Sequence, residues 1–205
     1  DLLLTRYWVI TGCKYQNWID IENELKLYSK NEDNAKFKTE YEALCKQLVV
    51  YINNIDYSSI NKNSKAYEVL TNLSSTKNNI ILDFNYTAST RLILKQCGLS
   101  DEDIDNRLIK VHGEASNNDI IFGVEDNAGI KKEHVFLRKA YNIKYKALNF
   151  SELYDRIKSV AIFGHSLGET DHTYFNKLFQ ESCMYNKWKI QCKLPPKTKR
   201  FCPLV

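Results

Sequence analysis

Residues with the chemistry for catalysis or ligand binding follow short apolar runs in the second half of the chain. The segment SVAIFGHSLGETD, residues 159–171, ends an apolar run at Gly164 and continues with His165, Ser166 and Asp171. Its G-x-S-x-G pattern matches the turn that presents the nucleophilic serine of α/β-hydrolases. The same pattern suits a backbone turn that holds phosphate or ribose oxygens at the start of a helix.

The hydrolase interpretation of Ser166 requires an acid and then a histidine from later strands. Asp171 and His172 both lie in or next to the first turn of one predicted helix, and no histidine follows His172. Adjacent helical residues point about 100° apart, so these two side chains cannot form a relay back to the serine. We therefore favour a binding turn. Asp171 either accepts a hydrogen bond from a ribose hydroxyl or only caps the helix.

Two further turns carry polar residues of interest. His112 follows the apolar run LIKV and precedes Gly113. An imidazole at a strand end can act as a general base, and the glycine is expected to leave room for a substrate. A structural role for His112 is the alternative. Asn85 follows IILDF, where it either meets a ligand or satisfies the local backbone of a turn.

The elements that must position these residues differ between the two halves of the chain. Residues of about 15–75 read as helical, because apolar residues recur at three- and four-residue steps. Ser64 is a predicted N-cap. One helix face should carry Phe37, Tyr41, Leu44, Leu48, Tyr51, Ile52 and Ile55.

From about residue 78 to 192 the pattern becomes α/β. Apolar runs at 79–84, 108–111, 119–124 and 159–163 predict buried strands, and helices are expected at 88–97, 133–146 and 151–158. We predict one domain over 1–205 with a mostly parallel, Rossmann-like sheet covered by helices on both faces. Because carboxyl ends of parallel strands meet at one crevice, Asn85, His112 and Ser166 should line one cleft.

Composition excludes several classes of protein. The 205 residues are 43% hydrophobic and 12% aromatic, which is typical of globular proteins and not of disordered or fibrous ones. No apolar run approaches the ~20 residues of a membrane span, so we expect a soluble cytoplasmic protein. Six cysteines without a C-x-x-C pair predict no metal site. The net charge of +4 is spread out, which makes nucleic acid an unexpected partner.

Four blocks together resemble the bacteriophage abortive-infection AbiH family. They are WIDIENEL, FNYT, VHG followed by IIFGV, and FGHSLGETDHTYF, and the resemblance runs from about residue 18 to 180. That family in turn resembles sirtuin-like NAD-binding domains. The resemblance implies an antiphage defence protein with a nucleotide ligand, NAD, bound or hydrolysed in the predicted crevice. It leaves open a homo-oligomer or a partner protein of a defence system.

The resemblance also implies roles for individual residues. By analogy with sirtuins, Asn85 lies near the nicotinamide, His112 acts as the base at the nicotinamide ribose, and Gly164 with Ser166 binds the nucleotide. These roles make Asn85 and His112 the expected catalytic residues. The remaining expected cofactor-binding residues are their neighbours Thr87, Gly113, His165 and Asp171.

Departures from the sirtuin pattern leave two functions open. Thr87 stands where the sirtuin turn has Asp, which favours a non-catalytic module that senses a nucleotide or phage component, whereas His112 favours an NAD glycohydrolase. No cysteine quartet follows His112, so we expect no deacetylase. The start DLLLTRYWVI lacks the Gly-Asn-Gly-Phe-Asp phosphate loop that the resemblance implies, and we expect that loop to be missing from this chain. The tail QCKLPPKTKRFCPLV also departs from the expected final strands.

Overall fold

The computed structural model describes residues 25–27, 29–30, 34–124, 128–139, 159–165, 171, 175 and 189–193. The chain divides into two compact units, Asp1–Ala147 and Leu148–Val205, which are described here one at a time. The single domain expected over 1–205 stays a prediction.

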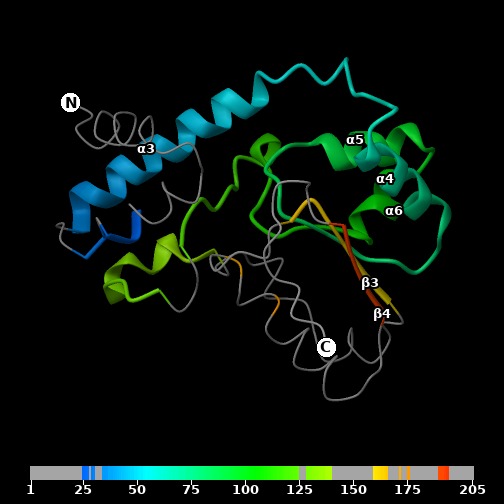
Figure 1. Ribbon diagram of the computed structural model, residues 1–205. Coiled ribbons are helices and arrows are strands. Elements are labelled where there is room, and N and C mark those ends of the chain that lie inside the picture. The colour runs from blue at the N-terminus through cyan, green and yellow to red at the C-terminus, as the bar shows by residue number, and fades with distance from the viewer. Residues whose placement is uncertain are drawn as a thin grey trace. The chain divides into compact units, whose positions relative to one another are not determined.

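The described part of the first unit contains the α-helices labelled in Figure 1, together with two short strands. Its α-helices are α3 (Asn34–Asn53), α4 (Lys65–Ser75), α5 (Ser89–Gln96) and α6 (Asp101–Asp105). The strands β1 (Ile81–Asp83) and β2 (Leu108–Lys110) follow α4 and α6, and the described part of the unit also includes the 3-10 helices η1 (Ala115–Asn117) and η2 (Lys132–Leu137). The helical character expected of about 15–75 is confirmed for α3 and α4.

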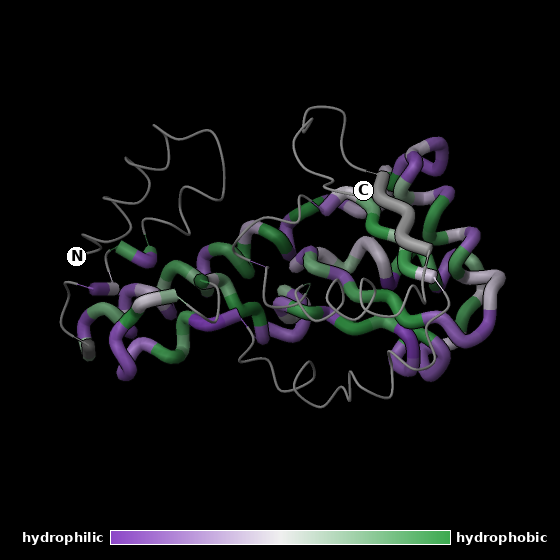
Figure 2. The backbone as a smooth tube through the Cα atoms, turned by 60° about the horizontal axis from the view of Figure 1, so that its bottom comes forward, coloured by the Kyte–Doolittle hydropathy of each residue, from purple (hydrophilic) through white to green (hydrophobic). Residues whose placement is uncertain are grey.

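Helix α3 buries an apolar stripe, although hydrophobic and hydrophilic residues occur along its whole length (Figure 2). Phe37, Tyr41 and Ile52 are buried, and the first two pack against Phe122 and Leu137. The expectation that Tyr51 and Ile55 share this face is wrong, since they are 68% and 38% exposed. At the end of the helix the buried residues are Val49 and Ile52. The buried positions there contact Ala115 in η1.

Helices α4, α5 and α6 pack in sequence around a second core (Figure 1). Ser64 caps α4 as predicted, accepting a hydrogen bond from the Tyr67 backbone N–H. Helix α5 agrees with the expected 88–97, and Gly98 follows it with a φ of 88°. The core of this region consists of Leu94, Ile104 and Leu108.

Strands β1 and β2 pair in parallel, with Leu82 opposite Ile109 and Asp83 opposite Lys110. Their pairing confirms two of the predicted strands and their parallel direction. The predicted strand 119–124 is wrong, because only Val124 forms an isolated parallel bridge, to Arg138. The backbone of that segment is used elsewhere: the Ile121 N–H donates to the His112 carbonyl, and the Phe122 carbonyl accepts from the Tyr41 hydroxyl.

The helix predicted over 133–146 is also not formed in its described part. Residues 132–137 are a kinked 3-10 helix, and Arg138 has an extended backbone. The backbone N–H groups of Val124 and Lys139 donate to the carbonyls of Leu137 and Val124, so the bridge replaces the next helical turn. Residues 140–146 and the helix expected at 151–158 lie outside the described residues.

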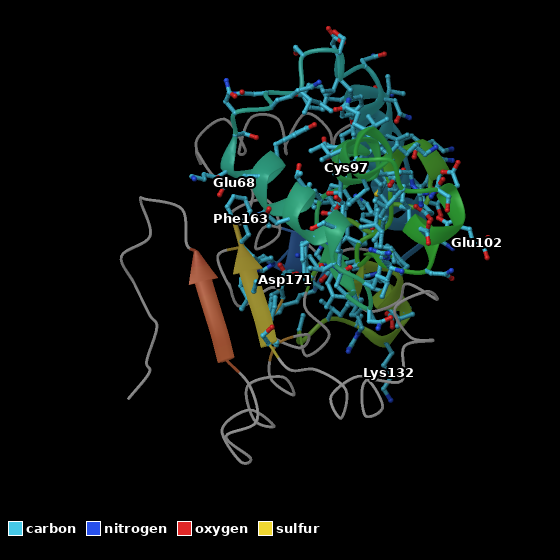
Figure 3. The ribbon with its side chains drawn as sticks, turned by 90° about the vertical axis from the view of Figure 1, so that its right-hand side faces the viewer. Glu68, Cys97, Glu102, Lys132, Phe163 and Asp171 are labelled. Carbon is cyan, nitrogen blue, oxygen red and sulfur yellow. The ribbon has the colours of Figure 1, made fainter. Side chains whose placement is uncertain are left out.

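The second unit contains a parallel strand pair, β3 (Ser159–Phe163) and β4 (Lys189–Lys193) (Figure 3). Strand β3 agrees with the predicted 159–163, whereas β4 had no counterpart in the sequence analysis. The chain therefore mixes helices with short parallel strand pairs. One wide sheet with helices on both faces stays a prediction. In the described part of the chain, no helix has the length and apolar character of a membrane span.

Candidate functional site

The turn that follows β1 is organised by the buried carboxylate of Asp83. Its Oδ1 accepts hydrogen bonds from the Asn85 backbone N–H, at 2.9 Å, and from Asn85 Nδ2, at 3.0 Å. Asp83 is 5% exposed, whereas Asn85 lies at the surface. Because the amide nitrogen of Asn85 is engaged by Asp83, its carboxamide oxygen is the end that an incoming group would meet.

A lysine from β2 joins the same turn. Lys110 Nζ lies 2.8 Å from Asp83 Oδ2 and donates to the Thr87 carbonyl at 2.7 Å. It also lies 3.9 Å from Glu114 Oε2, and the three charged side chains are between 4% and 7% exposed. A carboxylate, an ammonium and a second carboxylate are thus buried together at the carboxyl ends of β1 and β2.

Sequence reasoning missed Asp83, Lys110 and Glu114 as members of this site. The signal was present in the sequence, because Asp83 and Lys110 are charged residues inside the apolar runs IILDF and LIKV. Charged side chains in buried strands are rare unless they are paired, which would have predicted a contact between them.

His112 lies at the end of β2 with its ring packed against the turn after β1. The ring centroid is 5.4 Å from that of Phe84, edge to face, and 6.2 Å from that of Tyr86. His112 is 4% exposed. Aromatic rings therefore cover His112 at this end of the β1–β2 pair. The structure brings four predicted site residues to the same end: Asn85, Thr87, His112 and Gly113.

Gly113 has a role different from the expected one. Its φ is 77°, and a Cβ at this position would lie 2.1 Å from the Asp119 carbonyl oxygen. The Asp119 carboxylate also accepts a 2.7 Å hydrogen bond from the Glu114 backbone N–H. The space beside the glycine is filled by the chain itself and not left for a substrate. Gly113 is required so that the backbone of Asp119 can approach His112.

The N-terminus of α5, which has no side-chain cap, lies in the chain just after the turn that follows β1. No side chain caps the helix at Ala88, and its first turn holds no acidic residue. Ser89 Oγ lies 3.2 Å from Thr87 Oγ1. An uncapped helix start presents backbone N–H groups and the positive end of the helix dipole, which attract oxyanions.

The second unit holds the remaining described site residues. Gly164 ends β3 with a φ of 68°, and His165 follows it. His165 Nε2 lies 3.2 Å from Asp171 Oδ2, and both side chains are 13% exposed. The His165 ring packs edge to face on Phe175 at 4.9 Å. The sequence did not predict this pairing of His165 with Asp171.

Ser166 lies outside the described residues, so its binding role stays a prediction. Asn85 and His112 belong to the first unit, while Gly164, His165 and Asp171 belong to the second. The single cleft expected for Asn85, His112 and Ser166 stays a prediction, because Ser166 is not described and belongs to the other unit. In the described ranges no group of three His, Cys, Asp or Glu side chains is placed to hold a metal ion.

A pocket in the first unit lies apart from these residues. It has a volume of about 210 Å³ between α3 and the loop after η1. Burial raises the pKa of the Cys45 thiol at its wall. A protonated thiol is a poor nucleophile, so Cys45 adds no reactive group. The pocket is lined by Tyr41, Glu42, Cys45, Lys46, Val49, Asn118 and Ile120.

Comparison with known proteins links this arrangement to one family. The family model described as bacteriophage abortive infection AbiH matches residues 7–192 of the chain. A search of curated proteins and a search of solved structures found no match. The matched range includes β1, β2 and β3 and every candidate site residue. The chain therefore belongs to the bacteriophage abortive infection AbiH family.

Proposed function

We propose that this AbiH-family chain acts in abortive infection through a nucleotide site at the carboxyl ends of β1 and β2, with NAD as the ligand. The observation that carries the proposal is the contact of Lys110 with both Asp83 and Thr87, which holds the Asn85 turn beside His112. The uncapped start of α5 supports a phosphate-bearing ligand at the same end of the strands.

The proposed reaction is hydrolysis of the bond between nicotinamide and ribose. Water attacks the anomeric ribose carbon, and the electrons of the broken C–N bond neutralise the pyridinium nitrogen of the leaving nicotinamide. His112 accepts a proton from the water, and the Asn85 carboxamide oxygen accepts a hydrogen bond from the same water. The products are ADP-ribose, nicotinamide and one proton.

The remaining residues hold the ligand in this proposal. Thr87 and the N–H groups at the start of α5 contact its phosphates, and Gly113 shapes the turn that carries His112. For the second unit, taken by itself, we propose that Gly164, His165 and Ser166 bind a ribose or phosphate group, while Asp171 keeps the His165 imidazole oriented through their 3.2 Å contact.

A second candidate function is a nucleotide-sensing module without turnover. It is favoured by the 4% exposure of His112, because a general base must reach the water that it activates. Thr87 in place of an acid favours the same candidate. In this case the nucleotide binds at the strand ends, and the bound state signals to a partner or to a second copy.

Incubation of the purified chain with NAD separates the two candidates. Calorimetry measures binding, and chromatography of the nucleotides measures nicotinamide release. For the enzyme we expect turnover that falls about a hundredfold or more in His112→Ala, the usual contribution of a general base. Tight binding without nicotinamide release identifies the sensor. Absence of both binding and release refutes the nucleotide site.

A further inference from the structure

We propose that the buried Asp83–Lys110 pair is a positioning device for Asn85, and that it fixes which end of the Asn85 carboxamide meets the ligand. The inference rests on the proposed function for its consequence in catalysis. Its structural part concerns only the contacts between β1, β2 and the turn 84–87, and it can be tested without any nucleotide.

The device consists of a continuous set of contacts. Lys110 Nζ lies 2.8 Å from one oxygen of Asp83, and the other oxygen accepts two hydrogen bonds from Asn85. The same ammonium donates to the Thr87 carbonyl. Both ends of the turn are therefore tied to one cation on the neighbouring strand, and the parallel register that places Asp83 opposite Lys110 makes this geometry possible.

Burial gives these contacts their strength. Exposed ion pairs contribute little because water competes for both partners and screens their charges. The side chains of Asp83 and Lys110 are 4% and 7% exposed, so water competes little here. A carboxylate held by a buried ammonium has one favoured orientation, and Asn85 takes its own orientation from that carboxylate.

The orientation of Asn85 has a chemical consequence. With Nδ2 donating to Asp83, the carboxamide offers an acceptor to the ligand and not a donor. An acceptor suits the proton of an attacking water or the N–H of a carboxamide, and it does not suit a phosphate oxygen. The ligand group over Asn85 should therefore be a hydrogen-bond donor.

Glu114 makes the proposal testable by substitution. Its Oε1 accepts from the Ser116 hydroxyl, and its Oε2 lies 3.9 Å from Lys110 Nζ. In Asp83→Asn, Lys110 keeps Glu114 as a buried counter-charge, and the new carboxamide keeps one acceptor oxygen, which serves either the Asn85 N–H or Lys110 but not both. Asp83→Ala removes both acceptors. The matched control is Asp105→Asn, which breaks the exposed 2.6 Å pair between Arg91 and Asp105.

The first measurement is amide hydrogen exchange of the folded full chain by NMR. We expect the Asn85 backbone amide to exchange about tenfold faster in Asp83→Ala than in wild type, the equivalent of one net hydrogen bond. In Asp83→Asn protection should be partly retained, because Lys110 competes with the Asn85 N–H for the single acceptor oxygen, and in Asp105→Asn it should be unchanged. Wild-type protection of the Asn85 amide in folded Asp83→Ala would overturn the proposal.

A second measurement uses the wild-type protein and covers the case in which Asp83→Ala does not fold. One side-chain amide proton of Asn85 should exchange with water more slowly than the other, since Nδ2 donates to Asp83. Two equally fast protons would overturn the proposal without any variant.

The third measurement concerns the nucleotide. With NAD we expect kcat to fall at least tenfold in Asp83→Ala with little change in KM, because misplacing an orienting group acts on the reacting complex. Asp83→Asn should recover part of the rate. If the exchange results hold and wild type neither binds nor hydrolyses NAD, the proposed function fails while the positioning of Asn85 stands. An equal loss of rate in Asp83→Asn and Asp83→Ala would contradict positioning through the acceptor oxygen.

Discussion

At the residue scale, the main determinant of the site is close packing around the end of β2. His112 is enclosed by Phe84 and Tyr86, and its carbonyl accepts from the Ile121 N–H. Gly113 is the residue that permits this arrangement, since any side chain there would overlap the backbone of Asp119. Gly113 thus allows the turn to fold, and it affects the chemistry of His112 only through the shape of that turn.

Gly113→Ala should destabilise the protein strongly. Both the left-handed backbone and the overlap with Asp119 oppose a Cβ, so we expect a loss of about 3 kcal/mol or more in the free energy of unfolding. Gly98→Ala is the matched control, because Gly98 has a similar positive φ but nothing within 4 Å of its Cβ position. Its cost should be about 1 to 2 kcal/mol. Urea denaturation measures both, and equal losses would contradict the role assigned to Asp119.

At the scale of elements, α3 is attached to the segment after η1 by apolar packing and by a buried hydroxyl. Tyr41 OH donates to the Phe122 carbonyl at 2.6 Å, across 81 residues of sequence. Tyr86, in the turn after β1, donates a comparable 3.1 Å hydrogen bond from its hydroxyl to the Ile121 carbonyl. Two tyrosines from different elements thus hold neighbouring carbonyls of one segment. Their hydrogen bonds stand where a strand ladder was expected.

Tyr41→Phe tests the attachment of α3. The variant lacks the Tyr41 hydrogen bond to the buried Phe122 carbonyl, so the free energy of unfolding should fall by about 1 kcal/mol, the net contribution of one hydrogen bond. Tyr51→Phe on the same helix is the control, because Tyr51 is 68% exposed and its hydroxyl should matter by less than about 0.5 kcal/mol. Chemical denaturation followed by circular dichroism gives both values. Equal effects would show that the hydroxyl bond of Tyr41 adds nothing.

The same contact predicts a loss of stability in alkali. Burial raises the pKa of Tyr41 well above its ordinary 10.0, and burial also raises the pKa of Cys45 above 9.0. The unfolded chain therefore loses these protons before the folded chain does. Their contribution is complete below about pH 9 and is lost as pH rises through the folded pKa values.

Denaturation midpoints between about pH 8 and pH 11 check this prediction. The decline of stability above about pH 10 should be shallower in Tyr41→Phe than in wild type, because the variant has no phenol to ionise at that position. Parallel curves for the two proteins would contradict a buried, proton-holding Tyr41.

At the scale of the whole molecule, each of the two units has candidate site residues that follow a parallel strand. In the first unit these are Asn85, Thr87 and His112, and in the second they are Gly164 and His165, with Asp171 paired to His165. The family match spans both units, from residue 7 to 192. Abortive infection is therefore to be tested on the chain with both units present.

Phage infection of cells that express the chain provides this test. If the protein hydrolyses NAD, cellular NAD should fall after infection in cells with the wild type. With His112→Ala the fall should be absent or about a hundredfold slower, because a general base typically contributes a factor of that size to the rate. Asp105→Asn, which changes only an exposed ion pair, should behave as wild type. Unchanged NAD in cells that the wild type nevertheless protects would refute hydrolysis and favour the sensor.

The sequence by itself determined the local features and the family. Helices α3, α4 and α5, the Ser64 cap, the glycine after α5 and the strands at 81–83, 108–110 and 159–163 all follow from patterns within a few residues. These are the features that short-range sterics and hydrophobic periodicity control. The succession of blocks around Asn85, His112 and Gly164 was equally sufficient to indicate the AbiH family, which the match over residues 7–192 confirms.

Only the tertiary structure decided which groups meet. Lys110 and Asp83 are 27 residues apart, and nothing in either local pattern states that one neutralises the other. The exposure of Tyr51, the absence of a strand at 119–124 and the approach of Asp119 to Gly113 likewise depend on partners distant in sequence. Burial makes such pairings obligatory, because a charge or carbonyl removed from water must find a partner in the fold, and the partner is chosen by the packing of whole elements.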